Sequence, residues 1–200
     1  EEVTFTNQKA HVSLAGTLTY PVNYTPDKKV PVVIMVTGSG AQNRDEEVFA
    51  HKPFRVIADY LAKQGIASLR YDDRGVGQST GNQAGCTSAD FAEDAACGLS
   101  WLKSSGKFNQ VGILGHSEGG LIAFMLGAEG KADFLVSMAG PGIKGDSLLV
   151  EQQNALFKLK GIPSNVSVST LRKSMATQPG NVWLEYFMDY DPRPDLERIT

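Results

Sequence analysis

The sequence predicts an α/β fold, in which a doubly wound, mostly parallel sheet has helices on both faces. Short apolar runs rich in β-branched residues alternate with stretches whose apolar residues recur at helical spacing. The run Val32–Val36 is apolar throughout, as expected for a strand buried on both faces of a parallel sheet. Because consecutive parallel strands need a crossover, each helical stretch should lie across a face of that sheet.

Composition indicates one principal soluble domain. The 200 residues, 42% of them hydrophobic, are enough for a sizeable core. The formal net charge of -3 comes from 19 basic and 22 acidic residues without a basic block, which argues against nucleic acid as a partner. No apolar run approaches the roughly 20 residues of a membrane span. The compartment stays open, either cytoplasmic or exported after removal of a targeting segment.

The first half of the chain is expected to begin with antiparallel structure before the parallel strands. Val12–Tyr20 partly alternates apolar and polar residues, and a turn-rich stretch follows it. A helix is predicted over Pro53–Gln64, because Pro53 suits a first turn and Gly65 suits a C-terminal stop. Ile66–Tyr71 then resumes strand character, and a polar, glycine-rich loop runs from Asp72 to Gly85.

The second half continues the alternation. Thr87 and Asp90 form a capping pair for a helix that should run to about Lys103. The remaining predicted elements are a short strand, a helix and a further buried strand, at Val111–Leu114, Leu121–Ala128 and Phe134–Met138.

The alternation of strands and helices ends after Gly145, where three helical stretches follow one another with no strand between them. They are Leu148–Lys160, Thr170–Thr177 and Val182–Tyr190. We therefore expect a core over residues 1–144, a helical cap inserted over residues 145–190, and a return towards the core over residues 191–200. Trp183 and Phe187 of this cap are candidates for substrate binding, with ordinary core packing as the alternative.

The stretch Gly115-His116-Ser117-Glu118-Gly119 has the pattern G-x-S-x-G between a predicted strand and a predicted helix. In that setting the turn is sharp and strained, so the hydroxyl of Ser117 should stand clear as a nucleophile, with room only for small residues two positions away. The alternative is a tight structural turn that happens to contain serine. The pattern favours a nucleophile elbow.

Two backbone N–H groups are predicted to stabilise an oxyanion near Ser117. The first is the amide of Glu118, at the start of the following helix. The second should come from the loop after Val32–Val36, where the Ser39 N–H is the preferred candidate and the Gly40 N–H is the next one. A plain glycine turn is the alternative.

Three stretches of the chain resemble the α/β-hydrolase superfamily, in particular its serine aminopeptidase-like and esterase group. They are Thr37–Gly40 with Asn43–Glu46, Tyr71–Ser79, and Gly115–Gly120. The chain has Thr37 where many relatives have histidine. The resemblance implies the α/β-hydrolase fold, with this chain as its N-terminal part. It also implies structural ion pairs for Arg74 and makes Arg44 a candidate for substrate contact, although a structural arginine is the alternative.

The same resemblance implies a catalytic acid and then a histidine later in the chain than the serine. We expect both, with the last core strands, beyond Thr200. Residues 1–200 alone should then have at most a trace of esterase activity. Their open sheet edge should accept a complementary C-terminal fragment or a second copy.

The remaining reactive residues do not predict a cofactor. His11, His51 and His116 lack the spacing of a metal site, and Cys86 and Cys97 are expected to be free, packed thiols. The Gly75-Val76-Gly77 segment does not continue into a dinucleotide-binding loop, because Thr80 stands where that loop needs a small residue. We predict neither a metal nor another cofactor.

These features predict a serine hydrolase that cleaves small-molecule esters or related acyl bonds through an acyl-enzyme on Ser117. An aminopeptidase or acyl-peptidase of the same fold is the nearest alternative, since amide cleavage uses the same groups. A non-catalytic binding module that kept the hydrolase fold is the alternative from another class.

Overall fold

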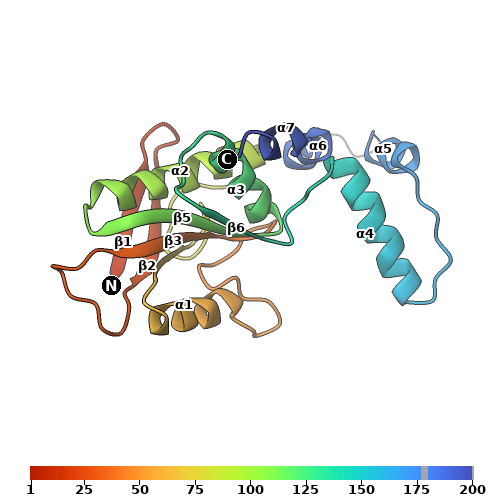
Figure 1. Ribbon diagram of the computed structural model, residues 1–200. Helices are drawn as coiled ribbons and strands as arrows, with labels where there is room; N and C mark the ends of the chain where they lie inside the picture. Colours follow the sequence, from red (N-terminus) through yellow and green to blue (C-terminus); the bar gives the residue numbers. More distant parts are fainter. Residues whose placement is uncertain (177–179, 200) are drawn as a thin grey trace.

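The structure is a computed structural model that describes residues 1–176 and 180–199. Its centre is the sheet seen in Figure 1, whose strands follow the order β1-β2-β4-β3-β5-β6. The strands are β1 (Glu2–Asn7), β2 (Val12–Thr19), β3 (Val30–Val36), β4 (Ala67–Tyr71), β5 (Phe108–His116) and β6 (Leu135–Met138). From β4 to β6 neighbouring strands pair in parallel, whereas β1 and β2 are antiparallel. The predicted α/β fold with an antiparallel start is confirmed.

Strand β1 was not predicted from the sequence. Its pattern is short and mixes charged and polar residues with only one large apolar side chain that becomes buried, Phe5. It forms because all six residues pair with β2, from Glu2 opposite Thr17 to Asn7 opposite Val12. This pairing places β2 between β1 and β4, so most of β2 is buried.

Helices cover both faces of the sheet. Figure 1 shows α1 (Pro53–Lys63) on one face and both α2 (Ser88–Ser104) and α3 (Glu118–Ala128) on the other. The smaller core cluster joins Phe54 and Ala58 of α1 to β3, while the larger one joins α2 and α3 to the strands. The predicted capping pair is present, with the Asp90 side chain accepting the Thr87 N–H at 2.8 Å.

In the described residues four helices follow β6, namely α4 (Gly145–Leu159), α5 (Val168–Ala176), α6 (Val182–Asp189) and α7 (Arg193–Leu196). The first three correspond to the predicted helical stretches, and no strand separates them within the described ranges; Thr177, the predicted end of the second, lies outside those ranges. Figure 1 shows α4 extending away from the sheet, whereas α6 and α7 lie beside α3. None of the described helices is long and apolar enough to cross a bilayer.

One predicted strand differs from expectation. Phe134–Met138 was predicted as a buried strand, but β6 is only half-buried and Val136 is 43% exposed. In the described part of the chain β6 pairs with β5 alone and forms the edge of the sheet. The apolar run thus predicted a strand correctly but predicted its burial incorrectly. Burial depends on a neighbouring strand, which the periodicity of the run cannot identify.

Candidate active site

Ser117 occupies the turn between β5 and α3, since the strand ends at His116 and the helix begins at Glu118. Its backbone has φ of 52° and ψ of -115°, a conformation that residues other than glycine rarely adopt. The Ser117 N–H donates to the Met138 carbonyl at 2.9 Å, and the Ser117 carbonyl accepts the Gly120 N–H at 2.9 Å. The backbone is therefore held in the strained conformation from both sides.

The turn is as tight as the pattern predicts. A Cβ atom on Gly115 would lie closer than 3.0 Å to the Gly119 carbonyl group, and one on Gly119 would do the same to the Val36 carbonyl. Such distances essentially never occur in folded proteins, and both obstacles are backbone. Glycine at these two positions is thus required for α3 to start directly against β5 and β3.

The sheet topology brings a second loop to Ser117. The β3 loop, which we define as residues 37–42, follows β3, and β3 pairs in parallel with β5 so that Val36 lies opposite Gly115. Strand order reverses between these two strands, and ligands of open α/β sheets bind at the carboxyl ends of strands at such a point. A Cβ placed on Gly38 would lie 3.3 Å from the Ser117 Cβ, so the loop and the turn are in close contact.

The structure brings the predicted oxyanion donors to this edge. Ser39 and Gly40 are exposed on the β3 loop, and Gly40 has φ of 96°. In the chain as described, the N–H groups of Ser39 and Glu118 have no hydrogen-bond acceptor. Both amides are therefore available to a bound oxygen, although their role as oxyanion donors stays a prediction.

The side chain of Glu118 connects the turn to α6. It is 2% exposed, and its Oε1 atom accepts hydrogen bonds from Ser88 Oγ at 2.6 Å and from Trp183 Nε1 at 2.7 Å. Trp183 stacks on Phe187, with ring centroids 5.5 Å apart. These contacts hold α6 beside the residue that follows Ser117.

A pocket of about 420 Å³ lies at this edge of the sheet. It is lined by Ser39, Gly40, Gln83, Cys86, Phe91 and Trp183. Of the residues predicted to contact substrate, the pocket thus contains Gly40 and Trp183. Phe187 is 5% exposed and packs behind Trp183 as part of the core, so the structure places it as support for the pocket wall.

The structure does not bring Arg44 into this pocket. Its guanidinium donates to both carboxylate oxygens of Asp72, at 3.1 and 2.8 Å, and it also bonds Thr17 Oγ1 at 2.8 Å. The hydrogen bonds that Arg44 donates to the Asp72 carboxylate raise the pKa of Arg44. Arg44 therefore ties the segment after the β3 loop to β2 and to the end of β4.

Arg74 makes the structural ion pair that the resemblance implies. Its Nε and Nη2 atoms donate to the two carboxylate oxygens of Asp94 at 2.7 and 2.8 Å. Both side chains are nearly inaccessible, with 6% and 3% exposed. The pair fixes the loop after β4 to α2, close to Cys86 and Phe91 of the pocket.

Two carboxylates near the β3 loop were not predicted. Glu46 Oε1 accepts the Gly38 N–H at 2.7 Å and lies 2.7 Å from His116 Nδ1. Asp73 accepts the Thr37 hydroxyl and the Gln42 N–H, each at 2.9 Å. The acidic run at residues 45–47 signalled charge beside the loop, but it did not indicate which of the three side chains turns inward.

Asp73 is electrostatically unusual. Burial raises its pKa to about 7, although the hydrogen bonds from Gln42 and Thr37 oppose the shift. The nearby carboxylates of Glu118 and Asp94 add to the increase. The carboxyl group that anchors both ends of the β3 loop thus titrates near neutral pH.

The three histidines occupy separate places. His11 lies in the exposed turn between β1 and β2, and His51 lies on an exposed loop where it pairs with Val48. His116 is held through Nδ1 by Glu46. In residues 1–176 and 180–199, no cluster of three or more His, Cys, Asp or Glu side chains has the arrangement of a metal site. Both cysteines are free and half-buried.

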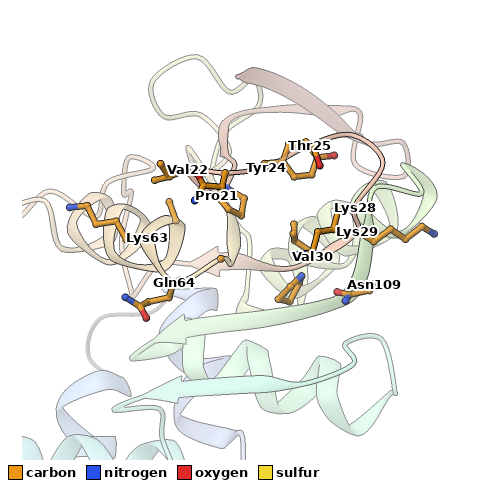
Figure 2. A pocket seen from close by; sticks show the side chains of 14 residues that line it. Pro21, Val22, Tyr24, Thr25, Lys28, Lys29, Val30, Lys63, Gln64 and Asn109 are labelled. Atoms are coloured by element: carbon orange, nitrogen blue, oxygen red, sulfur yellow. The ribbon is translucent and has the colours of Figure 1, made fainter.

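A larger pocket, of about 510 Å³, lies at the amino ends of the strands (Figure 2). The loop over Pro21–Val30, the end of α1 and Asn109 at the start of β5 form it. It lies at the opposite end of β5 from Ser117, so it is separate from the candidate site.

A protein-family model and a curated relative both match this chain in sequence. Residues 51–178 match the family model of the serine aminopeptidases S33. The chain is 31% identical over 153 residues to the esterase EstD of Thermotoga maritima. That match covers 76% of this chain but 36% of the relative, so the chain spans about a third of the length of that curated relative.

Solved structures show the same fold across the whole chain. The α/β-hydrolase GrgF from Penicillium sp. sh18 is similar with a TM-score of 0.66 and 18% identity, and the match covers 100% of this chain and 76% of that one. A Pyrococcus furiosus esterase is similar with a TM-score of 0.65 and 21% identity, covering 100% and 66% of the two chains.

Proposed function

Because this chain belongs to the serine aminopeptidase S33 family, we propose that it carries the nucleophile of a serine hydrolase that cleaves carboxylic esters through an acyl-enzyme on Ser117. The observation that supports this best is the strained Ser117 turn beside the β3 loop, where two unpaired N–H groups flank the serine. A strained backbone held by its surroundings is typical of reactive sites.

The proposed reaction follows from these groups. Ser117 Oγ attacks the ester carbonyl carbon and gives its proton to a general base, while the carbonyl oxygen becomes an oxyanion that accepts the N–H groups of Glu118 and Ser39. The carbon–oxygen bond to the alcohol breaks, and the alcohol leaves with the proton. Water then adds to the acyl-enzyme by the same steps and releases the acid. Among residues 1–176 and 180–199 we assign neither the base nor the acid that would orient it.

The pocket supports a small acyl substrate. Phe91 and Trp183 supply two aromatic walls beside Ser39 and Gly40, a composition typical of sites that bind apolar groups. We propose that residues 145–190 act as a cap through α6, because Trp183 of that helix bonds the residue next to the nucleophile.

Labelling with a fluorophosphonate probe tests the proposal. An activated Ser117 in the whole protein should displace fluoride and become covalently modified, whereas the Ser117→Ala variant should stay unlabelled. A folded protein that resists labelling and lacks ester turnover would favour the non-catalytic binding module.

An aminopeptidase or acyl-peptidase activity is the second candidate, which the family model's own description favours. The two functions differ in the leaving group, since an amine must be protonated as it departs. Comparing kcat/KM for short-chain esters with that for aminoacyl anilides separates them. Ester preference beyond the difference in intrinsic reactivity supports the esterase assignment.

A further inference from the structure

Glu46 joins two segments that lie on either side of the nucleophile. One oxygen, Oε1, accepts the N–H of Gly38, the residue before the predicted donor Ser39, and lies 2.7 Å from Nδ1 of His116, the residue before Ser117. The side chain is 6% exposed. A Cβ placed on Gly38 would lie 3.3 Å from the Ser117 Cβ, so the residue that Glu46 binds lies close to the nucleophile.

We propose that Glu46 is a positioning residue that sets the place of the β3 loop relative to Ser117, and hence the place of the Ser39 N–H. The inference rests on the proposed function, because it concerns the same oxyanion. Glu46 does not itself reach the substrate in this assignment. It acts through Gly38 on one side and His116 on the other.

The backbone around Glu46 is built to hold the carboxylate in place. Glu46 has φ of 51°, a left-handed conformation that persists in non-glycine residues only where neighbouring contacts impose it. Its N–H donates to the Asn43 carbonyl at 2.9 Å. The two preceding residues are ion-paired to the sheet, Arg44 with Asp72 and Asp45 with Arg70. The segment is thus anchored immediately before the residue that carries the carboxylate.

The hydrogen-bond chemistry defines what this contact does. The Gly38 N–H donates to Oε1 of Glu46, and Nδ1 of His116 lies 2.7 Å from the same oxygen. The Gly38 N–H is occupied by Glu46 and is therefore not an oxyanion donor. The next amide, that of Ser39, has no acceptor in the described residues and directly follows the anchored position. Glu46 thereby selects which amide of the loop faces the substrate.

Kinetics of Glu46 variants of the whole protein test this role. Glu46→Ala removes the acceptor and should lower kcat/KM for an ester by about 10- to 100-fold, up to the loss caused by removing one oxyanion donor. KM should change less than kcat, because the interaction strengthens at the transition state. Glu46→Gln keeps an oxygen acceptor for both donors and should recover most of the loss. Glu47→Ala, an exposed neighbour on the same segment, is the matched control.

A trifluoromethyl ketone inhibitor supplies a readout that a merely structural role would not move. Its hemiketal adduct with Ser117 carries an oxyanion at the same place, so its inhibition constant should rise by the same factor as kcat/KM falls. Stoichiometric fluorophosphonate labelling gives the concentration of folded sites for each variant. If Glu46→Ala does not fold, Glu46→Asp, which withdraws the carboxylate by one methylene, carries the same expectation.

Two results would overturn the inference. One is a folded Glu46→Ala variant whose kcat/KM and inhibition constant stay within about twofold of the parent; the other is a Glu46→Gln variant as impaired as Glu46→Ala. Loss of labelling in Ser117→Ala together with an undiminished Glu46→Ala overturns the Glu46 inference alone. Turnover that survives Ser117→Ala overturns both proposals.

Discussion

The turn at Ser117 with α3 and the outer helix α4 differ sharply in how tightly they are packed. From Glu118 to Leu126 every residue of α3 is buried, and two glycines before and within it touch neighbouring backbone. In α4 only Gly145 and Asp146 are buried, while Leu156 is 56% and Leu159 is 84% exposed. Seven of the 11 residues of α3 are apolar, against seven of the 15 residues of α4, so the more apolar helix is the one that is packed into the core.

This difference in packing predicts which substitutions should change activity and stability. Around Ser117 the neighbours are backbone atoms of β3 and α3, which cannot move without disturbing the sheet. Along α4 the outward side chains meet few neighbours, so the helix tolerates change within the structure as described. Activity and stability should therefore respond to the first region far more than to the second.

The largest effect should come from Ser117 itself. Ser117→Ala removes the nucleophile and should reduce ester turnover by a factor that can approach ~10⁶, because the whole covalent route is lost. The fold should remain, since the half-buried hydroxyl makes no core contact. Turnover by the purified whole protein and its thermal unfolding curve measure the two parts. Ser100→Ala, on the exposed face of α2, is the control, and turnover of Ser117→Ala within tenfold of the parent would end the nucleophile assignment.

The next largest effect should come from the glycine packed on β3. Gly119→Val would place a branched side chain against the Val36 carbonyl, and we expect a loss of about 4 kcal/mol or more in the free energy of unfolding. Gly142→Val is the matched control, because that position is open. Chemical denaturation of the two variants gives the comparison. A well-folded and fully active Gly119→Val variant would show that the turn is not as tight as described.

A smaller, pH-dependent effect should come from Asp73. Its pKa is raised to about 7 in the folded state from an ordinary 3.8, so between these values the folded state binds more protons than the unfolded state. The contribution of Asp73 to stability is therefore complete below about pH 4 and is lost as pH rises through about 7. The free energy of unfolding of the parent minus that of Asp73→Asn should fall with pH over this window, by at most about 1.4 kcal/mol per pH unit.

Denaturation at several pH values measures this slope. Asp59→Asn, at an exposed carboxyl on α1, should give a difference that varies little over the same range. A flat difference for Asp73→Asn between pH 5 and pH 8 would mean that the folded protein does not hold the proton on Asp73. Asp73 lies at the base of the β3 loop, so this measurement tests the closely packed region around Ser117.

The smallest effect should come from α4. Leu159→Ala should change the free energy of unfolding by no more than about 0.5 kcal/mol, because the side chain is 84% exposed. Leu121→Ala in α3, at 2% exposed, should cost about 2–5 kcal/mol. The two variants differ mainly in burial and are measured under one set of conditions. Equal losses would show that the outer helix is packed in solution as firmly as α3.

Residue patterns predicted most elements of the fold, and the reasons for the exceptions are physical. β3 and α1 were predicted within two residues because continuous apolar runs and helical spacing are local signals. β1 was missed because its six residues form a strand only by pairing with β2. β6 was predicted with the wrong burial because an edge position depends on a neighbour.

At the candidate site, local sequence predicted Ser117, Ser39, Gly40 and Glu118, since each belongs to a turn that contains glycine. It did not predict Glu46 or Asp73, because each lies in a polar stretch that contains other acidic residues. Local sequence did not distinguish Trp183 from Phe187, because both lie on one helical stripe. In the structure Trp183 lines the pocket, whereas Phe187 is buried behind it.

The strand-turn-helix at Ser117 follows from local sequence, because G-x-S-x-G restricts the backbone at positions that lie close together in any fold with that turn. Long-range packing, in contrast, places Gly38 near Ser117, Glu46 between Gly38 and His116, and the Trp183 indole beside Glu118. Glu46 and Gly38 are eight positions apart, whereas the other contacts join residues that are about 65 to 80 positions apart. Parallel pairing of β3 with β5 brings Gly38 and Glu46 to the turn at Ser117. Hydrogen bonds between such distant groups depend on strand order and register, which residue spacing does not encode.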